Sequence, residues 1–299
     1  MSRRLRFHMM AQEKPPVDFY VKNLPIMPVM AAKILRLARD GVNVSFSELE
    51  QTVRVDPGLT AKILRVANSA LYARQKEIGS LQLAISLLGF KNIRNMVVLI
   101  TASVFLEQQK STRLYQEYWQ QAVTSAFIAR RLSHVSGLAS LEEEAFLGGL
   151  LHNIGQLAFM TADQEGYEAI VDHARGKLGQ LRELERAWAG IDHLELGATL
   201  MESWNFPAMY RDIAHEHGNL HTNSPYNRLI MIVSMSGFLA NNILFHRNDP
   251  HELDLLQQQC SRLGLTIHAI EALVDEVGKS LSSDKYYKEC LSFFVKRVA

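Results

Sequence analysis

The sequence of 299 residues is long enough for one large domain or two modest ones. Its 32 lysines and arginines nearly balance 31 aspartates and glutamates, so no global field favours binding to nucleic acid or to a membrane surface. No apolar run reaches transmembrane length and no signal-peptide pattern is present, so we predict a cytoplasmic protein without a membrane partner. The two cysteines, Cys260 and Cys290, lack the CxxC spacing of a zinc site.

The predicted fold class is all-α. Leu, Ala, Ile and Met outweigh the strand-favouring residues, and no segment alternates convincingly with period two. Helix-start signals are frequent, among them capping boxes at residues 45–48 and 140–143, an Asp-Pro start at residue 56, and N-caps at Ser80 and Asp192. They predict helices at about 28–40, 45 onward, 56–70, 80–88, 90–107, 113–134, 140–155, 192–204, 207–217 and 225–246, with further amphipathic helices from about 250 to 299.

One apolar stretch, residues 144–156, contains the strongest candidate for a site. Its pattern predicts a helix that carries a single imidazole, His152, into the interior and ends at Gly155. A histidine buried at such a junction indicates a metal or catalytic site, although a structural ring bonded to the backbone fits the same pattern. Within the helix, the pair Gly148 and Gly149 is predicted to permit close helix packing.

Several segments together resemble one known family. They are LPIMPV at residues 24–29, DPGLTAKILRVANSALY at 56–72, IGSLQLAISLLGFKNIRNM at 78–96, AFLGGLLHNIGQ at 145–156, DHLELGA at 192–198 and WNFP at 204–207. In this order and spacing the chain resembles the HDOD domain, a bacterial signalling relative of the HD-domain metal phosphohydrolases. The resemblance covers roughly residues 20–245.

The resemblance implies an all-helical architecture in two parts. We expect a lead-in segment at 1–23, a helical N-terminal subdomain at 24–110, an HD-like helical bundle at 111–246 and a C-terminal helical extension at 247–299. The extension lies outside the resemblance, so its role is open.

Active HD enzymes bind a divalent metal through an early histidine, an adjacent His-Asp pair and a late aspartate. The cation lowers the pKa of a bound water enough to generate a nucleophile that attacks phosphate. In this chain the resemblance puts Gln121 at the early position, His152 and Asn153 at the pair, and Gly237 within the segment where the late aspartate belongs. Related enzymes carry a lysine where this chain has Gln156. The anionic ligands are therefore missing, and we predict no catalytic residue, no metal and no cofactor.

Two other histidines complete the expected vestigial pocket. His193 follows the N-cap Asp192, and His217 belongs to a local cluster with His215 and His221. Positions two apart on a helix diverge by about 200°, so His215 and His217 reach one ion only if the helix has ended. If His152, His193 and His217 converge, an all-imidazole site suited to zinc or nickel remains an alternative.

The sequence thus predicts a non-catalytic signalling module that binds a regulatory protein or a small signalling nucleotide. The alternative is a metal-dependent phosphohydrolase with a histidine-rich ligand set. Nucleic-acid binding through Arg3, Arg4 and Arg6 is a third reading, but a solvated chain end explains these residues better.

Overall fold

The computed structural model describes residues 80–105, 112–174, 178–204, 206–246, 250–281 and 283–292, together with positions 17, 19, 20, 50, 53, 60, 63, 64, 67 and 68. Every regular element within these residues is a helix, which confirms the predicted all-α class. The elements are α6 (Leu81–Leu88), α7 (Phe90–Phe105), α8 (Arg113–Val135), η2 (Ala139–Leu141), α9 (Glu142–Leu151), α10 (Ile154–Ala162), α11 (Gln164–Ala174), α12 (Leu178–Ala189), α13 (His193–Ser203), α14 (Ala208–Glu216), α15 (Asn227–Phe245), α16 (Pro250–Leu263), α17 (Ile267–Leu281) and α18 (Lys285–Ser292).

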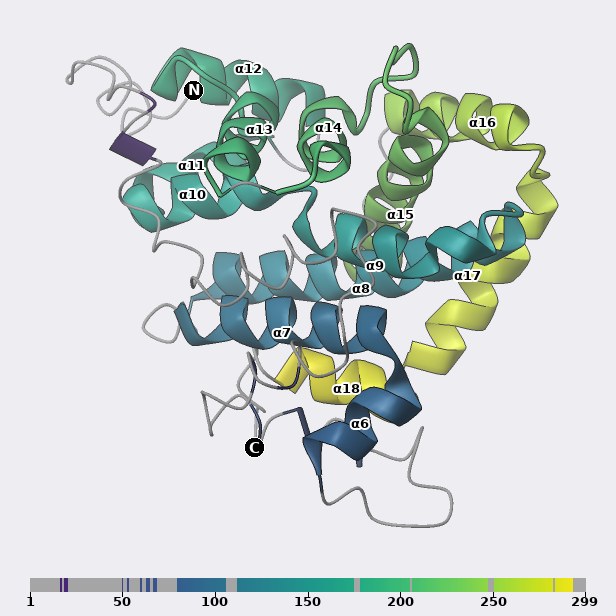
Figure 1. Cartoon of the computed structure of the whole chain (residues 1–299). Helices are drawn as coiled ribbons and strands as arrows, with labels where there is room; N and C mark the ends of the chain where they lie inside the picture. Colours follow the sequence, from purple (N-terminus) through teal and green to yellow (C-terminus); the bar gives the residue numbers. More distant parts are fainter. Residues whose placement is uncertain are drawn as a thin grey trace.

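Helices α8, α9 and α15 form the centre of the bundle, and α7 packs on α9 (Figure 1). The contact between α8 and α9 is close because α9 carries a glycine at the crossing point. A Cβ on Gly149 would lie 2.8 Å from the carbonyl oxygen of Ser125 and equally close to Cα of Ala126. The predicted packing role of this glycine is confirmed.

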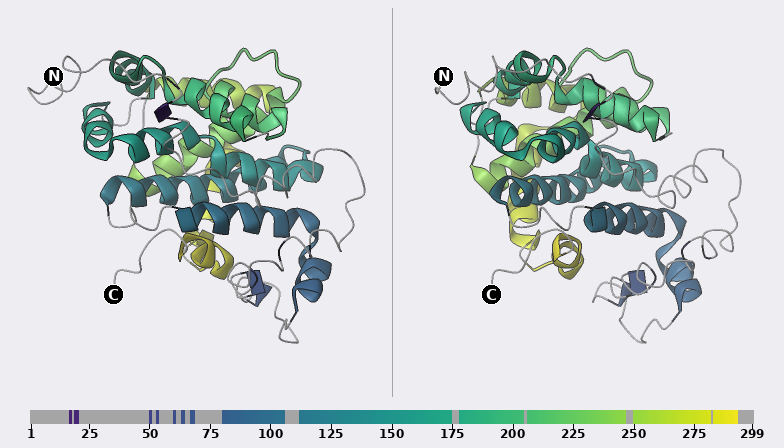
Figure 2. Two further views of the ribbon diagram at one scale, coloured as in Figure 1. Left: turned by 60° about the vertical axis from the view of Figure 1, so that its left-hand side comes forward. Right: turned by 90° about the vertical axis from the view of Figure 1, so that its left-hand side faces the viewer.

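The helices α10 to α14 form a layer above the α8–α9 pair in the orientation of Figure 1, and the two turned views show the same layering (Figure 2). The prediction that Gly155 ends the helix of His152 was wrong. Helix α9 already ends at Leu151, and Gly155 lies in the first turn of α10. A Cβ there would lie 2.0 Å from the carbonyl oxygen of His193, so the glycine lets α10 contact α13.

The helix-start signals gave mixed results. Ser80 accepts a hydrogen bond from the backbone N–H of Leu83, and Asp192 accepts from those of Leu194 and Glu195, so both predicted N-caps are confirmed. The predicted capping box at residues 140–143 was wrong. A single 3-10 turn occupies Ala139–Leu141, and α9 then begins at Glu142 without a side-chain cap.

Most of the predicted N-terminal elements, including the capping box at 45–48 and the Asp-Pro start at residue 56, lie outside the described residues. Among the positions described there, Ile63 and Ala67 are fully buried. Tyr20 is buried as well, and its ring meets that of Phe159 edge-on at 5.2 Å. The N-terminal segment therefore contributes to the same core as α10.

The C-terminal extension is joined to the bundle by buried contacts. The hydroxyl of Tyr287 on α18 lies 3.0 Å from that of Thr124 on α8, and its ring meets Phe127 edge-on at 5.4 Å. At the other end of the extension, Arg262 of α16 donates to the carbonyl oxygen of Leu220 at 2.8 Å. Helices α16 and α18 thus pack on opposite parts of one structure.

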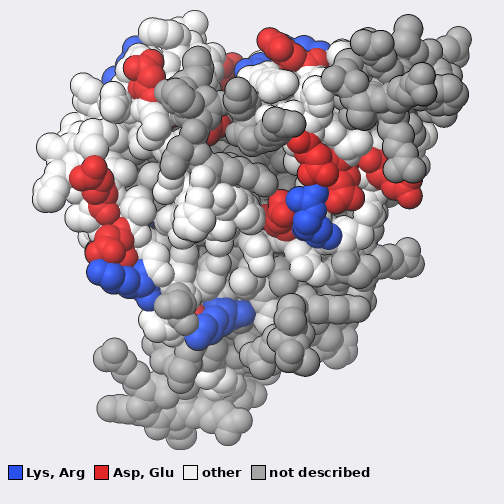
Figure 3. All heavy atoms as spheres, turned by 180° about the vertical axis from the view of Figure 1, so that it is seen from behind, with Lys and Arg blue, Asp and Glu red and all other residues white. Residues whose placement is uncertain are grey.

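Helix α15 is the one described helix that is long and apolar enough to cross a bilayer, with a mean hydropathy of 1.5. Most of that apolar window, 61%, is buried against the rest of the protein, as is usual for the central helix of a soluble bundle. The surface agrees with the balanced charge of the sequence. On the face opposite to Figure 1, acidic and basic side chains of the described residues lie near one another and neither sign dominates (Figure 3).

Candidate functional site

His152 lies in the turn between α9 and α10, and its ring is almost completely buried. Its Nδ1 lies 2.8 Å from the carbonyl oxygen of Gly149, so Nδ1 carries the proton and Nε2 is the acceptor. The side-chain amide of Gln121 lies 3.4 Å from Nε2 and at the same distance from the carbonyl oxygen of Gly237. Burial lowers the pKa of His152 to about 4, so the ring is neutral near pH 7.

Gly237 occupies the predicted position of the late aspartate and packs directly against this ring. A Cβ on Gly237 would lie 2.9 Å from Nε2 of His152 and 3.5 Å from Nε2 of Gln121. The imidazole and the amide therefore fill the space that an acidic side chain would need. The glycine thus allows His152 to pack directly against α15.

His217 caps the C-terminus of α14, and its backbone has already left the helical conformation. Its Nδ1 lies 3.1 Å from the carbonyl oxygens of both Ile213 and Ala214, and its Nε2 lies 3.1 Å from Oδ1 of Asn153. Burial, followed by the nearby rings of His152 and His193, lowers the pKa of His217 well below its ordinary value. A neutral ring carries one proton, so His217 donates either from Nδ1 to a backbone carbonyl oxygen or from Nε2 to Oδ1 of Asn153.

His193 is held differently, by a fully buried carboxylate. Its Nδ1 lies 2.6 Å from Oε2 of Glu185, which also accepts the backbone N–H of His193 at 3.0 Å. The hydroxyl of Tyr167 donates to the other oxygen of Glu185 at 2.6 Å. Within the described part of the chain, Nε2 of His193 has no hydrogen-bond partner.

The three predicted histidines converge. The ring centroids of His152 and His217 are 4.9 Å apart, and those of His217 and His193 are 5.9 Å apart. The other two members of the local cluster do not join them. His215 is exposed beside Glu216, and His221 is exposed near Arg262.

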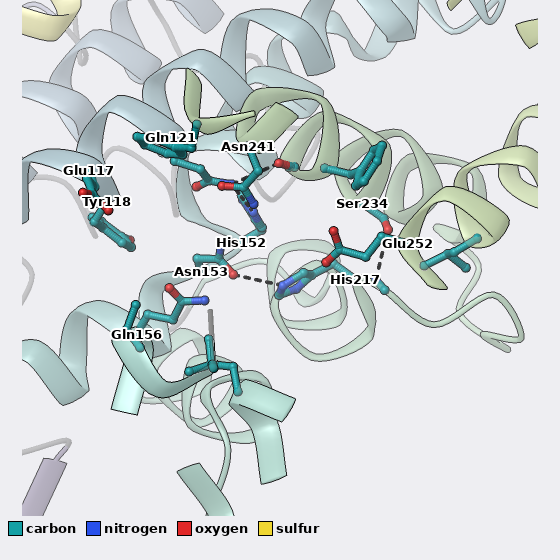
Figure 4. A pocket seen from close by; sticks show the side chains of 18 of the residues that line it. Glu117, Tyr118, Gln121, His152, Asn153, Gln156, His217, Ser234, Asn241 and Glu252 are labelled. Atoms are coloured by element: carbon teal, nitrogen blue, oxygen red, sulfur yellow. Dashed lines mark hydrogen bonds between the residues drawn. The ribbon is translucent and has the colours of Figure 1, made fainter. Parts of the chain in front are cut away.

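A pocket of about 130 Å³ lies beside these rings (Figure 4). Six of the seven predicted residues line it, and the seventh, His193, lies behind His217. Sequence reasoning missed further polar lining residues. Two of them, Glu117 and Tyr118, lie one turn before Gln121 on α8, so helical spacing could have indicated them. The others are contributed by α15 and α16: Ser234, Asn241, Glu252 and Gln259.

The donor set does not fit the divalent ion of an HD phosphohydrolase. Nε2 of His152 faces the amide nitrogen of Gln121, Nε2 of His217 faces Oδ1 of Asn153, and Gly237, which has no side-chain ligand atom, packs against His152. No group of three or more His, Cys, Asp or Glu side chains among the described residues is arranged to hold a metal ion. We therefore derive no chemical step through a metal.

The family model of the HDOD domain matches residues 24–220, which is more than half of the chain. The chain belongs to the HDOD domain family. Among solved structures, an HDOD domain protein of unknown function from Geobacter sulfurreducens is 18% identical with a TM-score of 0.68, and the alignment covers 93% of this chain and 98% of that one. This likeness shows that the HDOD fold extends over almost the whole chain.

Two further structures share the fold. A candidate phosphohydrolase from Shewanella amazonensis is 23% identical with a TM-score of 0.70, covering 93% of this chain and 98% of that chain. A candidate signal transduction protein from Marinobacter aquaeolei is 22% identical with a TM-score of 0.72, and the alignment covers 97% of this chain and 65% of that chain. An uncharacterised protein from Treponema pallidum is 24% identical over 213 residues, which are 70% of this HDOD chain but 41% of that longer protein.

Proposed function

We propose that this HDOD protein is a non-catalytic signalling module in which a former metal site has become a binding pocket. The observation that carries this proposal is the packing of His152 and Gln121 into the space beside Gly237. A metal-binding carboxylate at this position would have to displace both side chains. The residues at the early position and at the second position of the His-Asp pair, Gln121 and Asn153, are neutral amides that hold the imidazoles instead of a cation.

The electrostatics of the pocket support the same reading. A hydrolytic site needs a metal or a general base that generates a nucleophile near neutral pH. His152 donates from Nδ1 to a backbone carbonyl oxygen, and both ring nitrogens of His217 face oxygen atoms. Burial lowers the pKa of both rings below the useful range for a base. Their hydrogen bonds instead serve to fix the shape of the pocket.

A module of this kind acts through a partner. We propose a regulatory protein that docks at the joint between α7 and α9 or on the helices of the C-terminal extension, in a cytoplasmic bacterial setting. A small molecule bound in the pocket, such as a signalling nucleotide, would change the affinity for this partner. Polar contacts connect α7 and α9 at this joint. Asn95 of α7 donates to the backbone and side-chain oxygens of Glu143 at 3.0 and 2.9 Å.

The second candidate function is metal-dependent phosphohydrolysis with an altered ligand set. The unpartnered Nε2 of His193 favours it, because a histidine oriented by a carboxylate at Nδ1 is a common metal ligand. The candidate phosphohydrolase from Shewanella amazonensis shares the fold and gives the same alternative some weight.

Metal analysis of the purified protein, combined with a hydrolysis screen over nucleotides and phosphoesters with Mg²⁺, Mn²⁺, Zn²⁺ and Ni²⁺, separates the two functions. We expect less than stoichiometric metal and no turnover above that of His152→Ala. His268→Ala is the matched control, because this side chain is 95% exposed on α17. Stoichiometric tight metal with turnover that His152→Ala abolishes and His268→Ala preserves would establish the phosphohydrolase instead.

A further inference from the structure

Four carboxamide side chains line the pocket: Gln121, Asn153, Gln156 and Asn241. They come from α8, from the turn before α10, from α10 itself and from α15, and Figure 4 shows all four in the pocket wall. A carboxamide carries no charge and presents a hydrogen-bond donor beside an acceptor. A wall with several such groups is suited to a ligand that also has donors and acceptors side by side.

The amide of Gln121 is held in one orientation. Its Nε2 lies 3.4 Å from Nε2 of His152 and 3.4 Å from the carbonyl oxygen of Gly237. Both of these atoms are acceptors, since His152 donates from Nδ1 to Gly149. A reversed amide would place its oxygen against two acceptors, so Oε1 faces the other way.

The oxygen of this amide is open to the pocket. The side chain of Gln121 is nearly buried, with 6% of the residue exposed, and Oε1 has no hydrogen-bond partner among the described residues. It is not one of the fully enclosed polar atoms that lack a partner, so its open side is the pocket that Gln121 lines. Gln121 therefore offers a fixed acceptor to a ligand.

Asn153 offers the complementary donor. Its Oδ1 lies 3.1 Å from Nε2 of His217, so its Nδ2 points away from that ring. Within the described part of the chain, neither this nitrogen nor the side-chain amides of Gln156 and Asn241 have a hydrogen-bond partner, although all three residues line the pocket. A ligand that donates to Gln121 and accepts from Asn153 would satisfy both amides.

The remaining wall and the volume limit the ligand further. Apolar side chains make up much of the lining, among them Leu114, Met160, Phe238 and Leu256. The volume of about 130 Å³ has room for roughly ten water-sized groups, about the number of non-hydrogen atoms in a purine base. Apolar walls with a few polar groups that fix orientation are typical of sites for flat organic ligands.

Charge does not determine this recognition. The two carboxylates of the lining are not free, because Glu117 pairs with Arg113 at 3.1 Å and Glu252 is also engaged. The described lining residues include no Lys or Arg, so they offer a phosphate group no cationic partner. The described wall thus favours an uncharged ligand.

We propose that the pocket binds an uncharged purine base through its lactam edge, the adjacent N–H and C=O of a ring such as hypoxanthine. The lactam N–H donates to Oε1 of Gln121, and the lactam oxygen accepts from Nδ2 of Asn153. The amides of Gln156 and Asn241 contact the rest of the ring. This inference rests on the proposed non-catalytic function and makes its ligand specific.

Isothermal titration calorimetry of the full chain with hypoxanthine tests the proposal. Two isomers, 9-methylhypoxanthine and 1-methylhypoxanthine, test the edge, because only the second has lost the lactam N–H. We expect hypoxanthine and 9-methylhypoxanthine to bind, and 1-methylhypoxanthine to bind at least about tenfold more weakly. Inosine 5′-monophosphate should bind no more tightly than 9-methylhypoxanthine.

Variants test the residues. Gln121→Met removes the acceptor at nearly constant size and should weaken hypoxanthine by about tenfold. Gln120→Met is the matched control on the same helix, because Gln120 does not line the pocket, and it should leave binding unchanged. Gln156→Leu changes a partly exposed side chain without a described hydrogen bond, so the fold should be preserved while hypoxanthine binds a few times more weakly.

Several results would overturn the inference. They are no binding of hypoxanthine, equal binding of the two isomers, tighter binding of inosine 5′-monophosphate than of 9-methylhypoxanthine, and hypoxanthine binding unchanged by both Gln121→Met and Gln156→Leu in variants with native circular dichroism spectra. Absence of hypoxanthine binding in a protein that also lacks hydrolytic activity would refute the purine ligand alone. Metal-dependent hydrolytic turnover, in contrast, would refute the proposed function as a whole.

Discussion

The three converging histidines are buried to the same degree but are stabilised in two different ways. His152 and His217 contact backbone carbonyl oxygens and side-chain amides, and burial lowers the pKa of both rings so that they remain neutral. His193 bonds to the buried carboxylate of Glu185, and its other ring nitrogen has no hydrogen-bond partner among the residues that the structure describes. The difference shows that buried histidines that meet in one place can be held by quite different structural partners.

We expect the largest loss of stability from disturbing the contact between Gly155 and the backbone of His193. Gly155→Ala would force a Cβ to within 2.0 Å of the carbonyl oxygen of His193, and backbone atoms on both sides leave little room for relief. We expect the free energy of unfolding to fall by more than about 4 kcal/mol. Chemical denaturation measures this change.

Gly278→Ala is the matched control, since a Cβ at that site in α17 meets no atom within 4 Å. It should stabilise the protein by about 0.5–1 kcal/mol through helix propensity. Equal destabilisation by both substitutions would mean that α10 and α13 do not meet as closely as described.

Replacing Glu185, the carboxylate partner of His193, is the next test of the difference between the histidines. Glu185→Leu removes the acceptor of both His193 and Tyr167 from a site that is fully buried. We expect a loss of about 3 kcal/mol or more in the free energy of unfolding. Glu195→Gln, at an exposed carboxylate 3.5 Å from Arg186, should change it by less than about 1 kcal/mol. Similar values for the two variants would show that Glu185 has no special role.

The neutral histidines predict a pH dependence. The pKa of His152 is about 4 in the folded protein and about 6.5 when unfolded, so the unfolded chain binds more protons between these values. Stability should therefore fall as the pH decreases from about 6.5 to about 4, by up to about 3 kcal/mol from this ring, with His217 acting in the same direction.

Denaturation at a series of pH values checks this expectation. His152→Gln should flatten the decrease, whereas His268→Gln, at an exposed ring, should leave it unchanged. An unaltered slope in His152→Gln would mean that His152 titrates normally and that its environment is more polar than described.

Much of the site followed from the sequence because it lies on helices with strong periodicity and within a recognisable order of motifs. Gln121 lies on α8, His152 in the turn after α9 and Gly237 on α15, and the resemblance was enough to bring them together. Glu252 could not be predicted in this way, since its position depends on how α16 packs after α15, and local sequence does not encode that packing. Gly155 was misread because a helix-ending glycine and a close-contact glycine look the same in sequence.

Helix α16 supplies one wall of the pocket although it lies beyond the segment matched by the family model. Replacing this helix would leave the buried contacts of α8, α9 and α15 intact and would alter the charge and shape presented to a ligand. Exchange of the segment after α15 would therefore change the lining of the pocket while the central helices stay as they are.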